Sequence, residues 1–200
     1  MKKASLIIAL MAPSMLFAQE TRDLGAHEHG HSSLNIAIEN GQIAMELEAP
    51  GADIVGFEYA AETAEDRAKL DAAIATLSKP LSLFVLPAAA GCTVTSSSAG
   101  LIDGHHDDHD DHAHDDHAKE EGDDHAHDDH ATEEKAGHTE FHAEYLLTCA
   151  DPSAVNRIEF AFFKAFPNAQ EVEVQMISDK GSQGFEVERD APVLDLSGLI

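Results

Sequence analysis

The sequence predicts an α+β fold, built mostly from antiparallel β-sheet with one clear helix at about residues 63–79. Two observations favour it. Short segments in which apolar and polar residues alternate recur along the chain, as in strands with one buried face. A single longer segment has apolar residues at helical spacing instead. A third segment, residues 103–137, contains no aliphatic residue larger than alanine and is read as a disordered insert that interrupts the fold.

The first eighteen residues resemble a secretory signal peptide. Two lysines precede an apolar run at residues 4–17 that is too short to span a bilayer. Cleavage is expected after Ala18, and Gln19 follows where a lipid anchor of the bacterial kind would need cysteine. We therefore expect the mature chain in an oxidising compartment outside the cytoplasm, without a membrane-spanning segment.

A histidine array precedes the first expected strand. His27, His29 and His31 occupy alternate positions, so on an extended chain their imidazoles would point the same way, roughly 6–7 Å apart. The array then predicts a metal site, and the alternative is an exposed tail without a role. Two strands joined by a tight turn at Asn40-Gly41 follow. Their alternating apolar residues are Leu34, Ile36 and Ile38 before the turn and Ile43, Met45 and Leu47 after it.

The expected helix follows this hairpin. Thr63 with Asp66 three residues later resembles a capping box, and Pro80 ends the helical pattern. The apolar residues at helical spacing, assigned to the core, are Leu70, Ile74 and Leu77. Two further strands are expected at residues 81–86 and 92–97.

The chain after the insert is read as mostly strands. Their alternating apolar residues are Phe141, Ala143, Tyr145 and Leu147 in the first, Ile158, Phe160 and Phe162 in the second, and Val172, Val174 and Met176 in the third. The third should pair with a strand that contains Phe185 and Val187, across a turn at residues 179–184. Asp151-Pro152 marks a turn or a brief helical start, and Pro167 ends a short aromatic turn.

The insert itself carries metal ligands. The nonapeptide DDHAHDDHA occurs twice in it. Imidazole nitrogen and carboxylate oxygen suit zinc, and because thiolates are missing they suit Cu(II) and Ni(II) alike. The insert therefore predicts metal binding, and the alternative is a solvated linker. Its candidate ligands are His105, His106, His109, His112, His114, His117, His125, His127 and His130.

A further group of candidate ligands lies just after the insert. His138, Glu140 and His142 alternate with apolar residues of the expected strand, so they would line its opposite face. They predict a metal site or else a plain polar surface. The stretch HTEFH is not the H-E-x-x-H zinc protease motif, because its Glu comes one position late and its apolar period is two.

Cys92 and Cys149 flank the insert, and an even pair in an oxidising compartment predicts a disulfide, with two buried free thiols as the alternative. A bridge would place residues 19–102 and 138–200 in a single discontinuous domain. The formal net charge of −26, with histidine counted as neutral, argues against nucleic acid or an anionic membrane as partner and favours cations or basic protein surfaces.

Four segments are similar to one known family. They read GAHEHGHSSLNIAIENGQ at 25–42, APGADIVGFE at 49–58, HTEFHAEYLLTCADP at 138–152 and FFKAFP at 162–167. Together with a cysteine before a His/Asp insert, they resemble the ZrgA-like periplasmic zinc uptake proteins. The resemblance implies zinc capture in the periplasm in support of an inner-membrane importer or its solute-binding component, without catalysis.

The same histidine-rich pattern allows one alternative function, that of a protein that sequesters or buffers copper or nickel for metal tolerance. We do not expect an enzyme, because the sequence offers no nucleophile with a base, no phosphate-binding loop and no zinc protease motif.

Overall fold

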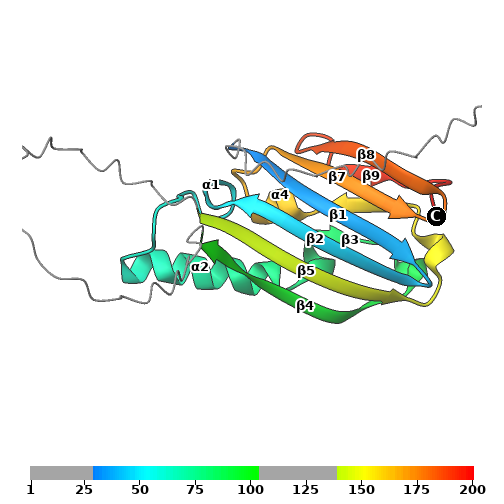
Figure 1. Cartoon of the computed structure of the whole chain (residues 1–200), viewed down its shortest axis with the longest axis horizontal. Coiled ribbons are helices and arrows are strands. Elements are labelled where there is room, and N and C mark those ends of the chain that lie inside the picture. The colour runs from blue at the N-terminus through cyan, green and yellow to red at the C-terminus, as the bar shows by residue number, and fades with distance from the viewer. Residues whose placement is uncertain (1–28, 104–138) are drawn as a thin grey trace, which may run out of the picture.

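The computed structural model describes residues 29–103 and 139–200 (Figure 1). The predicted signal peptide, His27, the predicted ligands of the insert and His138 lie outside the described residues. Six strands form the larger sheet, in the order β4-β5-β2-β1-β7-β8. They are β1 (His31–Glu39), β2 (Gln42–Pro50), β4 (Cys92–Asp103), β5 (Thr139–Cys149), β7 (Glu171–Ser178) and β8 (Gly181–Glu188).

A smaller sheet and several short helices complete the described fold. The small sheet has the order β3-β6-β9 and consists of β3 (Phe84–Val85), β6 (Arg157–Phe160) and β9 (Val193–Asp195). The α-helices are α1 (Gly51–Ile54), α2 (Ala64–Leu77), α3 (Pro80–Leu83) and α4 (Phe162–Ala165), and the 3₁₀ helices are η1 (Ala88–Ala90) and η2 (Pro152–Ala154). The predicted α+β class is confirmed. No helix in these two described ranges is both long and apolar enough to cross a membrane.

The larger sheet grows from the predicted hairpin. Asn40 and Gly41 have φ angles of 51° and 80°, and two positive values in succession give the turn whose twist matches the strands on either side. β1 then lies in the middle of the sheet, with β2 antiparallel on one side and β7 parallel on the other. This parallel pair was not predicted, since it joins His31 to Glu171, far apart in the sequence. The predicted pairing of β7 with β8 is confirmed.

The core lies between one face of the larger sheet and the elements behind it. In Figure 1 the larger sheet faces the viewer, and β3, β9 and α4 lie behind it. The buried sheet residues are those that the alternation predicted, such as Leu34, Leu47 and Phe141. They meet a group of aromatic rings, in which Phe84 contacts Phe160 with ring centroids 5.3 Å apart. The opposite face of the sheet carries no such layer among the described elements.

Two of the predicted strands are shorter than expected. Residues 80–83 form helix α3, and only Phe84 and Val85 of the segment 81–86 are in a strand. Pro80 explains the difference, because its fixed φ and missing N–H suit the first turn of a helix. Phe162, expected to continue the alternation of β6, instead begins α4.

Helix α2 begins as predicted. The hydroxyl of Thr63 accepts a hydrogen bond from the backbone N–H of Asp66, 3.0 Å away. The same hydroxyl donates to Oδ2 of Asp66 at 2.6 Å. Leu77 is fully buried, while Leu70 and Ile74 are partly buried against the core. The helix therefore contributes its last turn most strongly to the core.

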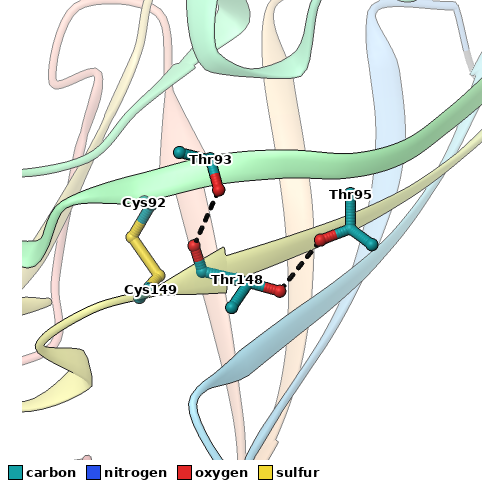
Figure 2. The surroundings of a disulfide bond; sticks show 5 residues. All are labelled: Cys92, Thr93, Thr95, Thr148 and Cys149. Atoms are coloured by element: carbon teal, nitrogen blue, oxygen red, sulfur yellow. Dashed lines mark hydrogen bonds between the residues drawn. A yellow bond between two sulfur atoms is a disulfide. The ribbon is translucent and has the colours of Figure 1, made fainter.

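The disulfide prediction is confirmed. Cys92 and Cys149 stand directly opposite each other in β4 and β5 and are bonded, with their Cα atoms 3.9 Å apart. Figure 2 shows the neighbouring contacts, in which Thr93 Oγ1 donates to the backbone oxygen of Thr148 at 3.4 Å. The hydroxyls of Thr95 and Thr148 lie 2.8 Å apart. The bridge and these contacts fasten the edge strand β4 to the rest of the sheet.

Candidate metal centre

The outward face of the larger sheet, turned away from the core, is acidic. The six strands contain nine glutamates and two histidines but no lysine or arginine. Alternation with the buried residues turns all eleven of these side chains outward. They are Glu39, Glu46, Glu48, Glu140, Glu144, Glu171, Glu173, Glu186 and Glu188, with His31 and His142.

One group on this face has the arrangement of a metal site. Glu46, Glu48 and His142 offer ligand atoms that all lie within 4.8 Å of one another. Nε2 of His142 is 3.0 Å from Oε1 of Glu46. In the sheet register His142 stands directly opposite Glu48, and Glu46 is its diagonal neighbour. We call these three residues the first site.

The first site offers the donor types that zinc takes, close enough together for small side-chain movements to bring them onto one ion. Zinc takes histidine nitrogen and carboxylate oxygen at about 2.0–2.2 Å, so neighbouring ligand atoms of one ion lie about 3–4 Å apart. The three side chains are half-buried and could close on an ion by small rotations. Three protein ligands leave a fourth position of a tetrahedral ion open. Ser33 Oγ also donates to Oε2 of Glu48 at 3.4 Å, which helps to orient that carboxylate.

Sequence reasoning found only part of this group. His142 was predicted as a ligand, and its place on the outward face of β5 is as expected. Glu46 and Glu48 were missed, although their alternation with Met45 and Leu47 marks them as outward residues of β2. Glu140, also a predicted ligand, lies on the same face of β5 opposite Pro50 and is not in the triplet.

His29 and His31, the two histidines of the N-terminal array within the described residues, do not lie on one extended strand as their spacing suggested. Gly30, between these two histidines, has a φ of 93° and lies in a turn, so the backbone is not extended from His29 to His31. Nε2 of His29 is 3.1 Å from Oε1 of Glu58. Nδ1 of His31 is 3.7 Å from Oε1 of Glu171. Each of the two histidines therefore faces a different carboxylate.

A buried carboxylate holds this turn in place. Oδ1 of Asp53 accepts a hydrogen bond from the backbone N–H of Gly30 at 2.7 Å, and Oδ2 accepts one from Ser32 Oγ at 3.4 Å. Burial raises the pKa of Asp53 above its ordinary value, although both hydrogen bonds and the charges of His29 and His31 act in the opposite direction. Asp53 thus links helix α1 to the start of β1.

Taken together, each of the three histidines within the described residues places a ring nitrogen close to a glutamate oxygen: His29 with Glu58, His31 with Glu171, and His142 with Glu46. A paired imidazole and carboxylate is half of a zinc ligand set. Only His142 has a third ligand atom within 4.8 Å. The first site is therefore the most complete candidate on the described surface.

Comparison with protein families gives one match, to a family described as "ZrgA family zinc uptake protein", over residues 26–196. Comparison with curated proteins finds no match. The matched range includes the first site, the N-terminal histidines from His27 onward, both cysteines and the insert.

Proposed function

Because the chain belongs to the ZrgA family of zinc uptake proteins, we propose that it is a periplasmic zinc-binding protein that captures zinc and supports its uptake by an inner-membrane importer. Membership of this family supports a role in zinc uptake in general terms. Capture through particular residues, residence in the periplasm and delivery to an importer or its solute-binding component are the parts that we propose.

The observation that carries the proposal is the first site. Glu46, Glu48 and His142 combine one nitrogen with two carboxylate oxygens within 4.8 Å. Structural zinc sites are closed by four protein ligands, whereas three ligands leave a position for water or for a ligand of another protein. An open position of this kind suits an ion that is held and then passed on.

The histidine-rich segments have a second role in this proposal. The insert, with its histidines from His105 to His130, would collect ions by the number of its imidazoles, and His27 and His138 would add further donors. The ordered first site would bind more tightly, because ligands held by a sheet lose less conformational entropy than those of an unfolded chain. Ions gathered by the insert would then move to the ordered site.

The test is a zinc titration of the full mature chain, followed by two-dimensional amide NMR. We expect the signals of residues 45–49 and 141–144 to shift and saturate with zinc. His142→Ala should abolish these shifts, while the control Thr148→Ala, on the same face of β5, should keep them. Zinc that leaves these signals unchanged in the wild-type chain would exclude the first site.

Delivery is tested by expression and growth. A protein that serves uptake should be made when zinc is scarce, and its loss should slow growth on zinc-limited medium. A sink for excess copper or nickel should instead be made when those metals are abundant. Production under copper or nickel excess alone would replace the uptake role with the sequestration role.

A further inference from the structure

We propose that the outward face of the larger sheet is a docking surface for a partner protein whose contact surface places apolar side chains beside lysine or arginine. The inference rests on the proposed function for the purpose of the contact, which is to pass on the ion. The contact itself is argued from shape and charge.

A groove of about 700 Å³ crosses the middle of the outward face. This face is turned to the viewer in Figure 1, and no described helix or strand lies over it. Five neighbouring strands, β7, β1, β2, β5 and β4, contribute residues to the groove. Short side chains leave the face hollow here, because larger residues beside them reach further from the backbone. They are Ala37, Ala44, Ser96 and Ser98.

The apolar residues of the groove form one row across four strands. Ile177 of β7 stands beside Ala37 of β1, and Ala37 stands opposite Ala44 of β2. Ala44 in turn stands opposite Leu146 of β5. Ile177 is 61% exposed, and Leu146 is half-buried. With strands about 4.8 Å apart, the row is roughly 14 Å long, and continuous apolar surface of this kind is typical of the centre of a protein contact.

The next row along the same strands is acidic. Glu46 stands opposite Glu144 in the pair of β2 and β5, and both line the groove beside the apolar row. Glu48 and Glu173 lie one step further out on their strands. No lysine or arginine occurs in the six strands to offset these charges. A partner that fits both rows therefore needs apolar side chains with cationic ones next to them.

Other occupants do not have this charge. A second copy of this chain, bound through the same face, would set glutamates against glutamates, which repel. Residues 104–138 contain fourteen acidic residues and two lysines, and residues 19–28 contain three acidic residues and one arginine. These segments of the chain would also be repelled by the acidic row. A different protein with a basic surface is the occupant that the charges favour.

The groove adjoins the first site. Glu46 lines the groove and is also one of the three residues of the first site. A partner seated in the groove would therefore lie beside an ion held there. Since three protein ligands leave one position of a tetrahedral ion open, a side chain of the partner could fill it. This is the arrangement that transfer of an ion between two proteins requires.

The experiment places a photoreactive benzophenone amino acid in the full chain, either at position 177 in the groove or at position 193. Val193 is the matched control, because it is also an apolar strand residue, 50% exposed, but lies in the small sheet. Cells that make each chain are irradiated, and mass spectrometry identifies what is joined to it. We expect position 177 to be joined to one other protein, at a segment with apolar residues beside lysine or arginine. Position 193 should not be joined to that protein.

The protein identified in this way is then purified, and its affinity for the mature chain is measured. Ile177→Ser should weaken binding by about tenfold, as for an apolar residue at the centre of a contact, and Val193→Ser by less than about twofold. Glu144→Gln should weaken binding at low salt and have less effect at high salt, because salt screens the attraction. Glu62→Gln, an exposed charge before α2, is its control and should have no such effect.

The inference would be overturned if position 177 gives no adduct, if both positions give the same adduct, or if the adduct is a second copy of this chain. An affinity that does not fall with added salt would also overturn it. The contact and the first site can fail separately. Ile177→Ser should leave the zinc shifts of residues 45–49 as in the wild type, whereas His142→Ala should remove those shifts and keep the adduct at position 177.

Discussion

Nε2 of His142 lies 3.0 Å from Oε1 of Glu46, although the residue directly opposite His142 in the sheet is Glu48. The twist of a sheet brings diagonal neighbours within reach of long side chains. One imidazole on β5 therefore meets two carboxylates of β2. An ion could bind there by rotation of side chains alone, without movement of either strand.

Replacing residues 104–138 with a short Gly/Ser loop should leave the domain folded. Asp103 and Thr139 are direct partners in the pair of β4 and β5, so their ends are close enough for a tight hairpin loop. We expect a cooperative thermal transition near that of the full chain and a zinc capacity lower by more than one ion. Calorimetry and equilibrium dialysis measure the two quantities. Loss of cooperative unfolding would show that the replaced segment is needed for the fold.

Removing the disulfide should destabilise the domain by roughly 2–5 kcal/mol, the range typical of native bridges. The bridge closes a loop of 57 residues and fastens the edge strand β4. The double variant Cys92→Ser with Cys149→Ser avoids an unpaired thiol, and urea denaturation gives its free energy of unfolding. The reduced wild-type chain should have the same free energy of unfolding as the double variant. A double variant whose urea midpoint equals that of the oxidised wild type would contradict the prediction.

Thr63→Ala should lower stability by about 1 kcal/mol, because the first turn of α2 loses the side-chain acceptor for the N–H of Asp66. Thr76→Ala is the matched control, since Thr76 Oγ1 donates only to the oxygen of Ala72 inside the same helix. That change should cost less, because alanine is the better helix former. Urea denaturation of both variants compares them, and equal losses would argue against capping.

Asp53→Asn should change how stability depends on pH. Burial raises the folded pKa of Asp53 above its ordinary value of 3.8. The folded state then holds the proton more tightly than the unfolded state does. The protonated Asp53 therefore contributes its full share to the stability of the fold below about pH 3.8, and this contribution is lost as the pH rises through the folded pKa. The free energy of unfolding of the wild type, relative to Asp53→Asn, should therefore fall between pH 4 and 7.

Urea denaturation of both proteins across this range gives the difference, and the exposed Asp71→Asn controls for the loss of one charge. If the free energy of unfolding of the wild type instead rises relative to that of Asp53→Asn as the pH rises, the two hydrogen bonds and the nearby histidines outweigh burial.

The sequence was most informative where one residue's neighbours along the chain decide its conformation. The hairpin at Asn40-Gly41, the cap of α2 and the alternation of β5 all have local causes, and all were predicted. The disulfide followed from the number of cysteines and the expected compartment. Pro80 was read as the end of one helix, whereas it also begins the next, because proline suits a first helical turn.

The first site was half predicted because its other half depends on strand register. Nothing in the sequence near His142 points to Glu46 and Glu48, which are about a hundred residues away and become neighbours only when β2 pairs with β5. The same holds for His31 and Glu171 across the parallel pair. His29 and His31 were expected to act together, but their ring nitrogens lie beside different carboxylates, those of Glu58 and Glu171.

The central place of β1 has a consequence for how the chain folds. β1 can pair with β2 as soon as the hairpin is made. Its other edge pairs with β7, in which the partner of His31 is Glu171, 140 residues later in the chain. Contacts so distant in sequence slow folding, because the loop must close before they form. In a chain that ends before Glu171, the edge of β1 that carries Leu34, Ile36 and Ile38 would have no strand beside it. Unpaired strand edges of this kind form backbone hydrogen bonds with strands of other molecules. Incomplete chains should therefore aggregate through β1.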